Sequence, residues 1–339
     1  MNVTVAAALT APSLGAALLL GLAASPASET VKLQFAPAVG ATVEHEIQIS
    51  SQIKGGDLSV VMDGNEVPAQ FLPKLNFAIE TSTAATFADE FLEVEEGIEG
   101  PWRKRTISAI EGILSMEMGM GEESFDFGSE GTSDLDGNPF LIGRDEDGEK
   151  VVRWATEDSE LSTEPLDLQR PEIDLAGLLP EDAVSIDDTW EADAGFLAEV
   201  LDFGRTLPWT WSGSDSAQIP APGVAEWQGD LDLKVADITK VENDVRCVIS
   251  FTGEAVETVT KPGDLSQVPV AEGTATETTV TTFQVEGEIT WSVSAGHLVS
   301  FELEADGEGE QVTKKDDGQP GPAYESTTRH TTQLSVELD

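Results

Sequence analysis

Alternation of apolar and polar residues, repeated along most of the chain, is the feature that most constrains its fold. Val43, His45, Ile47 and Ile49 place their side chains on one side, while the residues between them face the other side. The same period of two recurs at residues 75–79, 231–235, 247–251, 289–293, 299–303 and 334–338. Each segment is typical of a half-buried strand, so the chain is predicted to be mainly β.

Short turn sequences at residues 242–244 and 294–296 join neighbouring strands, which predicts antiparallel hairpins. Helical spacing is confined to residues 196–201, with one further turn expected at residues 175–179. We therefore predict long antiparallel strands in a curved sheet, forming a half-barrel or a sandwich, with one or two short helices.

Four segments interrupt the alternation and indicate how the chain is organised: residues 119–148, 156–180, 206–229 and 307–322. The first is rich in Gly, Asp, Glu and Ser, and the last is expected to be a long polar loop before the final strand. The expected divisions are an N-terminal β lobe at 28–155, a connecting segment at 156–180 and a C-terminal β lobe at 181–339.

The first 27 residues are expected to be a signal peptide. Residues 14–22 (LGAALLLGL) form an apolar run too short to span a bilayer, and Ser25-Pro26-Ala27 supplies the small residues of a cleavage site before Ser28. No Lys or Arg precedes Lys32, so a buried core helix is the alternative. No later run reaches about 18 apolar residues. We therefore expect a secreted or periplasmic protein that does not span a membrane.

The charge balance is strongly acidic, with 18 Lys and Arg against 64 Asp and Glu and a formal net charge of -46. Binding to nucleic acid needs clustered Lys and Arg, so this class of partner is disfavoured, and so is an anionic membrane surface. The single cysteine excludes an intrachain disulfide and a CxxC redox pair.

One pattern resembles a known group of proteins. Residues 179–190 (LPEDAVSIDDTW), followed by Trp291 and by residues 295–300 (AGHLVS), look like a pattern shared by uncharacterised exported bacterial β-rich proteins. Asp187 stands where that pattern usually has glycine. These proteins look distantly similar to the curved half-barrels of bacterial lipoprotein carriers, a resemblance that implies a groove for acyl chains.

Motifs for nucleophilic or nucleotide chemistry are missing, including GxSxG, the P-loop and GxGxxG. His45-Glu46 begins like a zinc HExxH motif, but Ile49 occupies the position of the second histidine. With so many carboxylates, a carboxylate-based hydrolase such as a glycosidase stays open as an alternative function. A structural role for an acidic surface protein is a further alternative.

Two acidic turns are candidate calcium loops. Asp134 and Asp136 stand beside Gly137, and Asp145 and Asp147 stand beside Gly148, so carboxylates alternate next to a tight turn. Neither completes the spacing of an EF-hand, and ordinary Asp-Gly hairpin turns explain both equally well.

The favoured function is non-enzymatic binding of an apolar or amphiphilic molecule, or of a component of the cell envelope. The segment after residue 206 is expected to cover an apolar sheet face as a lid and so to leave a cavity. Three tryptophans would line its opening and three apolar residues its floor: Trp209, Trp211 and Trp227, and Phe196, Leu197 and Leu201. A tightly packed sandwich would use the same residues without any ligand.

Overall fold

The computed structural model describes residues 30–120, 123–156, 162–170, 173, 175–212, 224–263, 274–316 and 323–339. The expected signal peptide, residues 1–27, lies outside the described residues. Within them no helix has both the length and the apolar character needed to cross a membrane.

The described strands form one antiparallel sheet of 14 strands, as expected for a mainly β chain. The strands are β1 (Thr42–Met62), β2 (Asn65–Glu66), β3 (Leu75–Leu92), β4 (Ile98–Met120), β5 (Glu123–Ser133), β6 (Phe140–Asp145), β7 (Lys150–Trp154), β8 (Thr189–Asp193), β9 (Trp209–Trp211), β10 (Val224–Val241), β11 (Asp244–Gly263), β12 (Ala275–Ser292), β13 (His297–Lys315) and β14 (Tyr324–Leu338).

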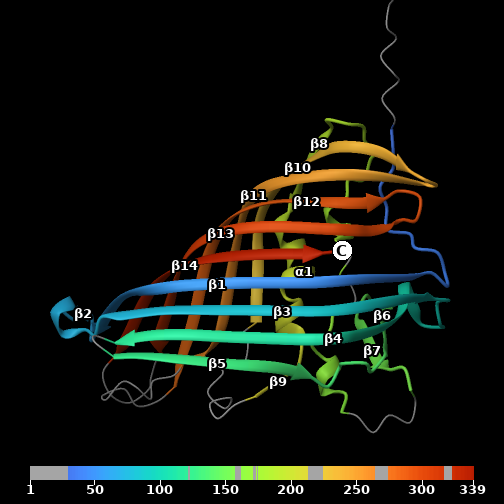
Figure 1. Ribbon diagram of the computed structural model, residues 1–339. Coiled ribbons are helices and arrows are strands. Elements are labelled where there is room, and N and C mark those ends of the chain that lie inside the picture. Colours follow the sequence, from blue (N-terminus) through green and yellow to red (C-terminus); the bar gives the residue numbers. More distant parts are fainter. Residues whose placement is uncertain are drawn as a thin grey trace, which may run out of the picture.

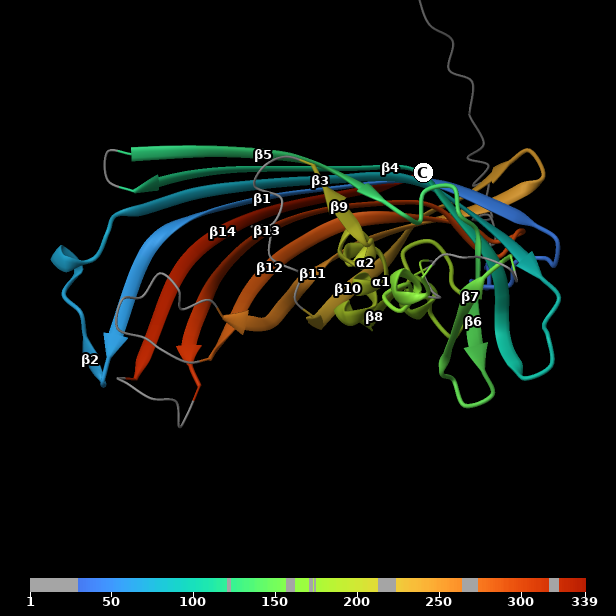
Figure 2. The same ribbon diagram turned by 90° about the horizontal axis from the view of Figure 1, so that it is seen from below.

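The sheet is curved and open, with the order β7-β6-β4-β3-β1-β14-β13-β12-β11-β10-β8 (Figure 1). β4 is long enough to pair with β6 near its start and with β5 near its end. The curvature gives the sheet an inner face, which carries the helices, and an outer face (Figure 2). Of the two predicted architectures, the half-barrel describes this arrangement.

Strands from both predicted lobes lie in the same sheet, because β1 pairs with β14 over most of its length. One inner row of paired residues crosses six strands through Ile49, Val336, Leu303, Gly287, Phe251 and Leu233. Gly287 is required in this row, since a Cβ there would lie 2.4 Å from the Phe251 ring. The division at residues 156–180 stays a prediction.

Short helices pack on the inner face near one end of the long strands (Figure 2). They are η2 (Glu164–Leu166), η3 (Ala176–Leu178), η4 (Ala194–Leu197), α1 (Ala198–Leu201) and α2 (Phe203–Thr206). A further short helix, η1 (Ala69–Phe71), lies beside β2 at the opposite end of the sheet, and none of its residues is buried. We call residues 194–206, which form η4, α1 and α2, the helical plug. Its apolar residues join the main buried cluster with Ile47, Phe87, Ile249 and Phe301.

Two of the expected irregular segments are wrong in the structure. Residues 307–315 belong to β13 and do not form a loop. The missing side chains of Gly307 and Gly309 let this strand pass close to Phe283 and His330, with which a Cβ would collide. Residues 119–148 likewise include all of β5 and all of β6. In β13 and in the second half of β5, glycine or polar residues such as Gly307, Gly309 and Gly131 occupy inner positions, so the sequence there lacks the apolar half of the alternation.

Candidate functional site on the inner face

The helical plug covers only part of the inner face, and beyond it the sheet presents a second apolar surface. Phe77 and Ile79 of β3 pair with Met118 and Met116 of β4 and point to the same side as the core residue Phe87. These four side chains are half-buried, and none belongs to the main buried cluster of the described residues. We call them, together with Leu58 of β1 and Phe127 of β5, the open inner face.

Methionine is concentrated at this end of the sheet. Of five methionines in the chain, Met62 lies in β1 and Met116, Met118 and Met120 lie in β4. The thioether side chain is flexible and polarizable, so it adapts to apolar molecules of irregular shape. The concentration therefore suits a binding surface better than a rigid core.

The strands next to the open inner face present polar side chains to the same side of the sheet. Thr281 of β12 contacts His330 of β14, with 3.0 Å between Oγ1 and Nε2. Burial lowers the pKa of His330 below its usual value, which favours the neutral ring. Lys261 and Glu277 form an ion pair of 2.8 Å nearby on β11 and β12. Beyond the helical plug, the described residues of the inner face therefore form an apolar side on β3 and β4 and a polar side on β11, β12 and β14.

Trp209 and Trp211 stand at the border between the helical plug and the open inner face. β9 pairs with residues 131–133 of β5, and the two indole rings lie 5.2 Å apart. Gly112 and Gly131 make room for them, since a Cβ at either position would lie within 2.7 Å of the Trp209 ring. Trp209 Nε1 donates to the Gly204 carbonyl at 2.7 Å, which ties the border to the helical plug.

The other predicted site residues do not gather in one cavity. Leu197 and Leu201 are buried in the main cluster beneath the sheet, and Trp227 stacks on Phe283 within it. Phe196 is 39% exposed and packs against Gly177 on the far side of the helical plug. The expected floor is thus filled by the plug itself.

The residues of the open inner face were not among the predicted site residues, although the sequence carries their signal. Leu75, Phe77 and Ile79 alternate clearly, and so do Leu114, Met116 and Met118. What the sequence could not show is which strand ends the helical plug leaves uncovered.

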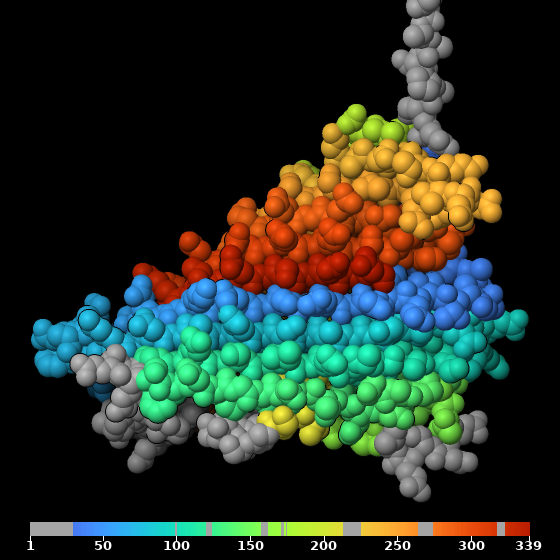
Figure 3. Space-filling model, viewed as in Figure 1, coloured from blue at the N-terminus to red at the C-terminus, as the bar shows by residue number. Residues whose placement is uncertain are grey.

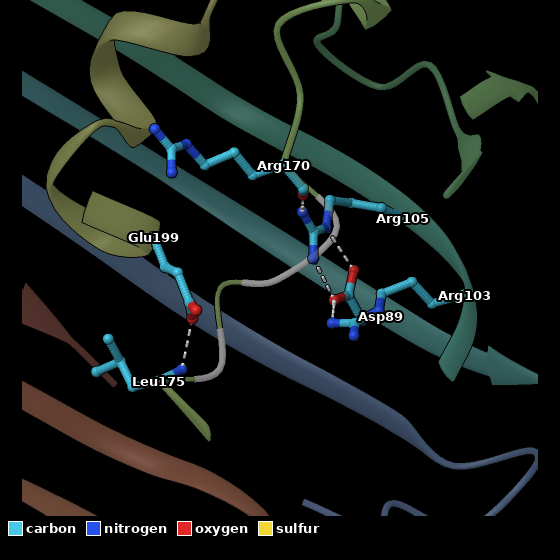
Figure 4. A network of polar contacts seen from close by, with 6 residues as sticks. All are labelled: Asp89, Arg103, Arg105, Arg170, Leu175 and Glu199. Atoms are coloured by element: carbon cyan, nitrogen blue, oxygen red, sulfur yellow. Dashed lines mark hydrogen bonds and ion pairs between the residues drawn. The ribbon is translucent and has the colours of Figure 1, made fainter. Parts of the chain in front are cut away.

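A buried ion-pair network attaches the chain around the helical plug to the sheet (Figure 4). Asp89 accepts hydrogen bonds from Arg105 at 2.7 and 2.6 Å and from Arg103 at 3.2 Å. Burial alone would raise the pKa of Asp89, but the two guanidinium groups lower it below its usual range. Arg105 also donates to the backbone carbonyl of Arg170 at 2.9 Å, outside the sheet.

Asp202 of the helical plug continues this network. It pairs with Arg170 at 2.5 Å and accepts a hydrogen bond from Trp227 Nε1 at 3.3 Å. Burial raises the pKa of Asp202, and the nearby Arg170 and Arg205 oppose this effect. Arg205 also forms an ion pair with Glu257 of β11.

Asp202 and Glu257 are two buried carboxyl groups with a shared cationic partner, and the alternative hydrolase function would need such a pair. Both contact Arg205, so each has a cationic partner in the folded chain. An acid catalyst must instead carry a proton and face its substrate. The contacts therefore favour a structural role for this pair.

The two acidic turns lie at the ends of strands. Asn138 donates to the backbone carbonyls of Asp134 and Asp136, and Asp145 accepts from the backbone N–H groups of Asp147 and Glu149. These are contacts that stabilise ordinary turns. Nowhere in the described part of the chain do three or more His, Cys, Asp or Glu side chains group in a way that could hold a metal ion.

The outer face, onto which Figure 3 looks, carries mostly the polar residues that alternate with the inner apolar ones. It has a hollow of about 1060 Å³, whose lining includes Gln52, Gln284, Asp306 and Gln333. Gln333 donates to Asp306 at 3.1 Å, so part of this lining is satisfied internally. The apolar surface is therefore on the inner face.

A scan of the chain against protein-family models finds no match, and a search of curated proteins finds no significant match either.

Proposed function

We propose that this chain is an exported, non-enzymatic protein that binds an amphiphilic molecule, such as a fatty acid or lysolipid, on the open inner face. The observation that carries the proposal is the apolar surface of Phe77, Ile79, Met116 and Met118, which the helical plug leaves uncovered. An apolar patch on a concave surface is a common mark of a binding site.

The division of the inner face supports an amphiphile over a purely apolar ligand. An acyl chain would lie against β3 and β4, where each buried CH₂ contributes about 0.8 kcal/mol. The polar end would lie toward β11 and β12, where Lys261 and Glu277 form a partly exposed ion pair. The tryptophans at residues 209 and 211 would border the acyl chain.

Export is supported by the apolar run before Ser28 and by the small residues of the expected cleavage site. Val31 forms a β-bridge with Val184, and Leu33 is buried, so the chain is part of the fold a few residues after the expected cleavage point. A carrier for an apolar molecule is useful where that molecule must cross an aqueous compartment.

Titration with a fluorescent fatty acid tests the proposal with two variants of the same strand. Met116→Glu places a charge on the open inner face, whereas Ile113→Glu places one on the outer face, where Ile113 is 55% exposed. We expect saturable binding to the wild type, unchanged affinity in Ile113→Glu and at least about tenfold weaker affinity in Met116→Glu.

Melting curves of both variants show whether the fold is intact. Absence of saturable binding to the folded wild type, or equal affinity in the two variants, would contradict the proposal and favour a structural role for an acidic surface protein.

A further inference from the structure

The open inner face is bounded where it meets the helical plug. One row of paired inner residues marks this boundary: Thr83 of β3, Gly112 of β4 and Gly131 of β5. Gly204 of the helical plug packs on the row, since a Cβ at Gly204 would lie 2.9 Å from Oγ1 of Thr83. The plug therefore covers the β3 end of the row.

Two indole rings cover the rest of the row. A Cβ at Gly112 or Gly131 would lie within 2.7 Å of the Trp209 ring, and at Gly131 it would also approach the Trp211 ring to 2.9 Å. The hydrogen bond from Trp209 Nε1 to the Gly204 carbonyl joins the rings to the plug, and β9 lies beside α2 (Figure 2). We call Gly204, Trp209 and Trp211 the wall, because together they cross β3, β4 and β5 at one level.

The two tryptophans occupy different positions in the wall. The described residues that pack against the main buried cluster include Trp209 but not Trp211. Along β5, Trp211 is level with Gly131 and Trp209 is level with Ser133. Trp211 is therefore the ring nearer to Phe127 of the open inner face.

The apolar surface in front of the wall is long enough for one acyl chain. Its inner residues on β4 are Leu114, Met116 and Met118, and on β3 they include Ile79 and Phe77. At about 3.4 Å per residue, the four steps from Leu114 to Met118 span about 14 Å. One leaflet of a bilayer's hydrocarbon core, half of about 30 Å, has nearly the same thickness.

We propose that the wall is an end stop for the ligand: the methyl end of the acyl chain contacts Trp211, and the polar end points away from the helical plug. The end stop rests on the proposed function and narrows the ligand to an amphiphile with an acyl chain of limited length. The opposite orientation would place the polar group against indole rings, where it would lose its hydration without gaining a hydrogen bond.

Titration with saturated fatty acids of increasing chain length, each below its critical micelle concentration, tests this proposal. For the wild type we expect the affinity to rise about fourfold for each added CH₂ up to a limiting length, and to rise little beyond it. Trp211→Ala removes the ring nearer the ligand, so the limiting length should increase. The first fatty acid beyond the wild-type limit should then bind more tightly to the variant.

Trp190→Ala is the matched control. Trp190 is also a half-buried tryptophan, but it lies in β8 at the opposite edge of the sheet from β9. Its replacement should leave the limiting length unchanged. Circular dichroism establishes that both variants fold.

Quenching of tryptophan emission in the wild type tests the orientation without any variant. Bromine quenches nearby indole rings, so a fatty acid brominated at its methyl end should quench more strongly than one brominated beside its carboxylate. No saturable binding of any fatty acid to the folded wild type would overturn both the proposed function and the end stop. Saturable binding with the same limiting length in folded Trp211→Ala, or equal quenching by the two brominated acids, would overturn the end stop alone.

Discussion

At the scale of single residues, buried charges control both stability and its pH dependence. Asp89, Arg103 and Arg105 are nearly inaccessible to solvent, yet each has an oppositely charged partner. The buried cluster of these three charges is tolerated because opposite charges contact one another. Removing one partner leaves the remaining charges unpaired in a low-dielectric interior.

Asp89→Asn should therefore lower the free energy of unfolding by about 3–5 kcal/mol, because two buried guanidinium groups lose their counter-charge. Glu90→Gln on the same strand is the control, as Glu90 pairs with Lys104 where the two side chains are 45% and 40% exposed. Its expected cost is about 0–1 kcal/mol. Urea denaturation measures both values, and equal losses would show that the network does not stabilise the fold.

His45 should make the protein less stable as the pH falls. Burial lowers the pKa of His45 to about 4, with Asp89 raising it and His297 lowering it further. Between pH 6.5 and 4 the unfolded chain therefore binds a proton that the folded chain does not. The free energy of unfolding should fall by about 3 kcal/mol over this range. His45→Gln should flatten the slope in melting curves recorded at several pH values, and an unchanged slope would contradict this assignment.

At the scale of elements, glycines on the inner face determine where the border tryptophans can sit. Gly131 and Gly128 lie on the same strand, but a Cβ at Gly131 would lie 2.7 Å from Trp209 and 2.9 Å from Trp211. A Cβ at Gly128 would meet nothing within 4 Å.

Gly131→Ala should displace β9, lower the free energy of unfolding by about 1–3 kcal/mol and shift tryptophan emission to longer wavelength. Gly128→Ala should be neutral or slightly stabilising, because alanine reduces the entropy of the unfolded chain. Denaturation followed by fluorescence distinguishes them. The same emission spectrum in both variants would mean that the positions of Trp209 and Trp211 do not depend on the space beside Gly131.

The strands most easily predicted from the sequence are those whose inner positions are apolar, such as residues 43–49 and 247–251. The sequence misses strand where the inner positions hold glycine or threonine, as in residues 307–315 of β13. Those residues are small or polar because aromatic rings and His330 fill the space above them. Asp187 stands where the resembled pattern usually has glycine. Its φ of 72° is a backbone conformation that glycine adopts readily, so the substitution leaves that conformation in place.

The candidate site was only partly predictable for the same reason. Trp209 and Trp211 do lie at the border of an apolar surface, but of the residues expected to form its floor Leu197 and Leu201 are buried in the main cluster and Phe196 packs against Gly177. Which part of a long strand stays uncovered depends on contacts far apart in sequence, such as the bond from Arg105 to the Arg170 carbonyl. Alternation within a strand carries no information about those contacts.

At the scale of the whole molecule, the net charge of -46 implies self-repulsion that salt should screen. Repulsion between carboxylates occurs on the outer face, where Glu302 lies directly opposite both Glu288 and Glu337 on neighbouring strands. Like charges in that position destabilise a sheet.

Glu302→Lys should raise the free energy of unfolding by about 0.5–1 kcal/mol at low salt, because two repulsive pairs become attractive. The gain should largely disappear at about 1 M salt, where the screening length is about 3 Å. Melting temperatures of the wild type and the variant at both salt concentrations measure this. A wild-type melting temperature that does not rise with salt would contradict the role given to self-repulsion.

Photo-crosslinking maps the location of a bound amphiphile most directly. A fatty acid with a photoreactive group at its apolar end is bound to the wild type, irradiated and located by mass spectrometry of the peptides. The predicted labels fall on Phe77, Ile79, Met116 or Met118, and excess unlabelled fatty acid should suppress them. Labels confined to the outer face, or labels that excess fatty acid does not reduce, would contradict binding on the open inner face.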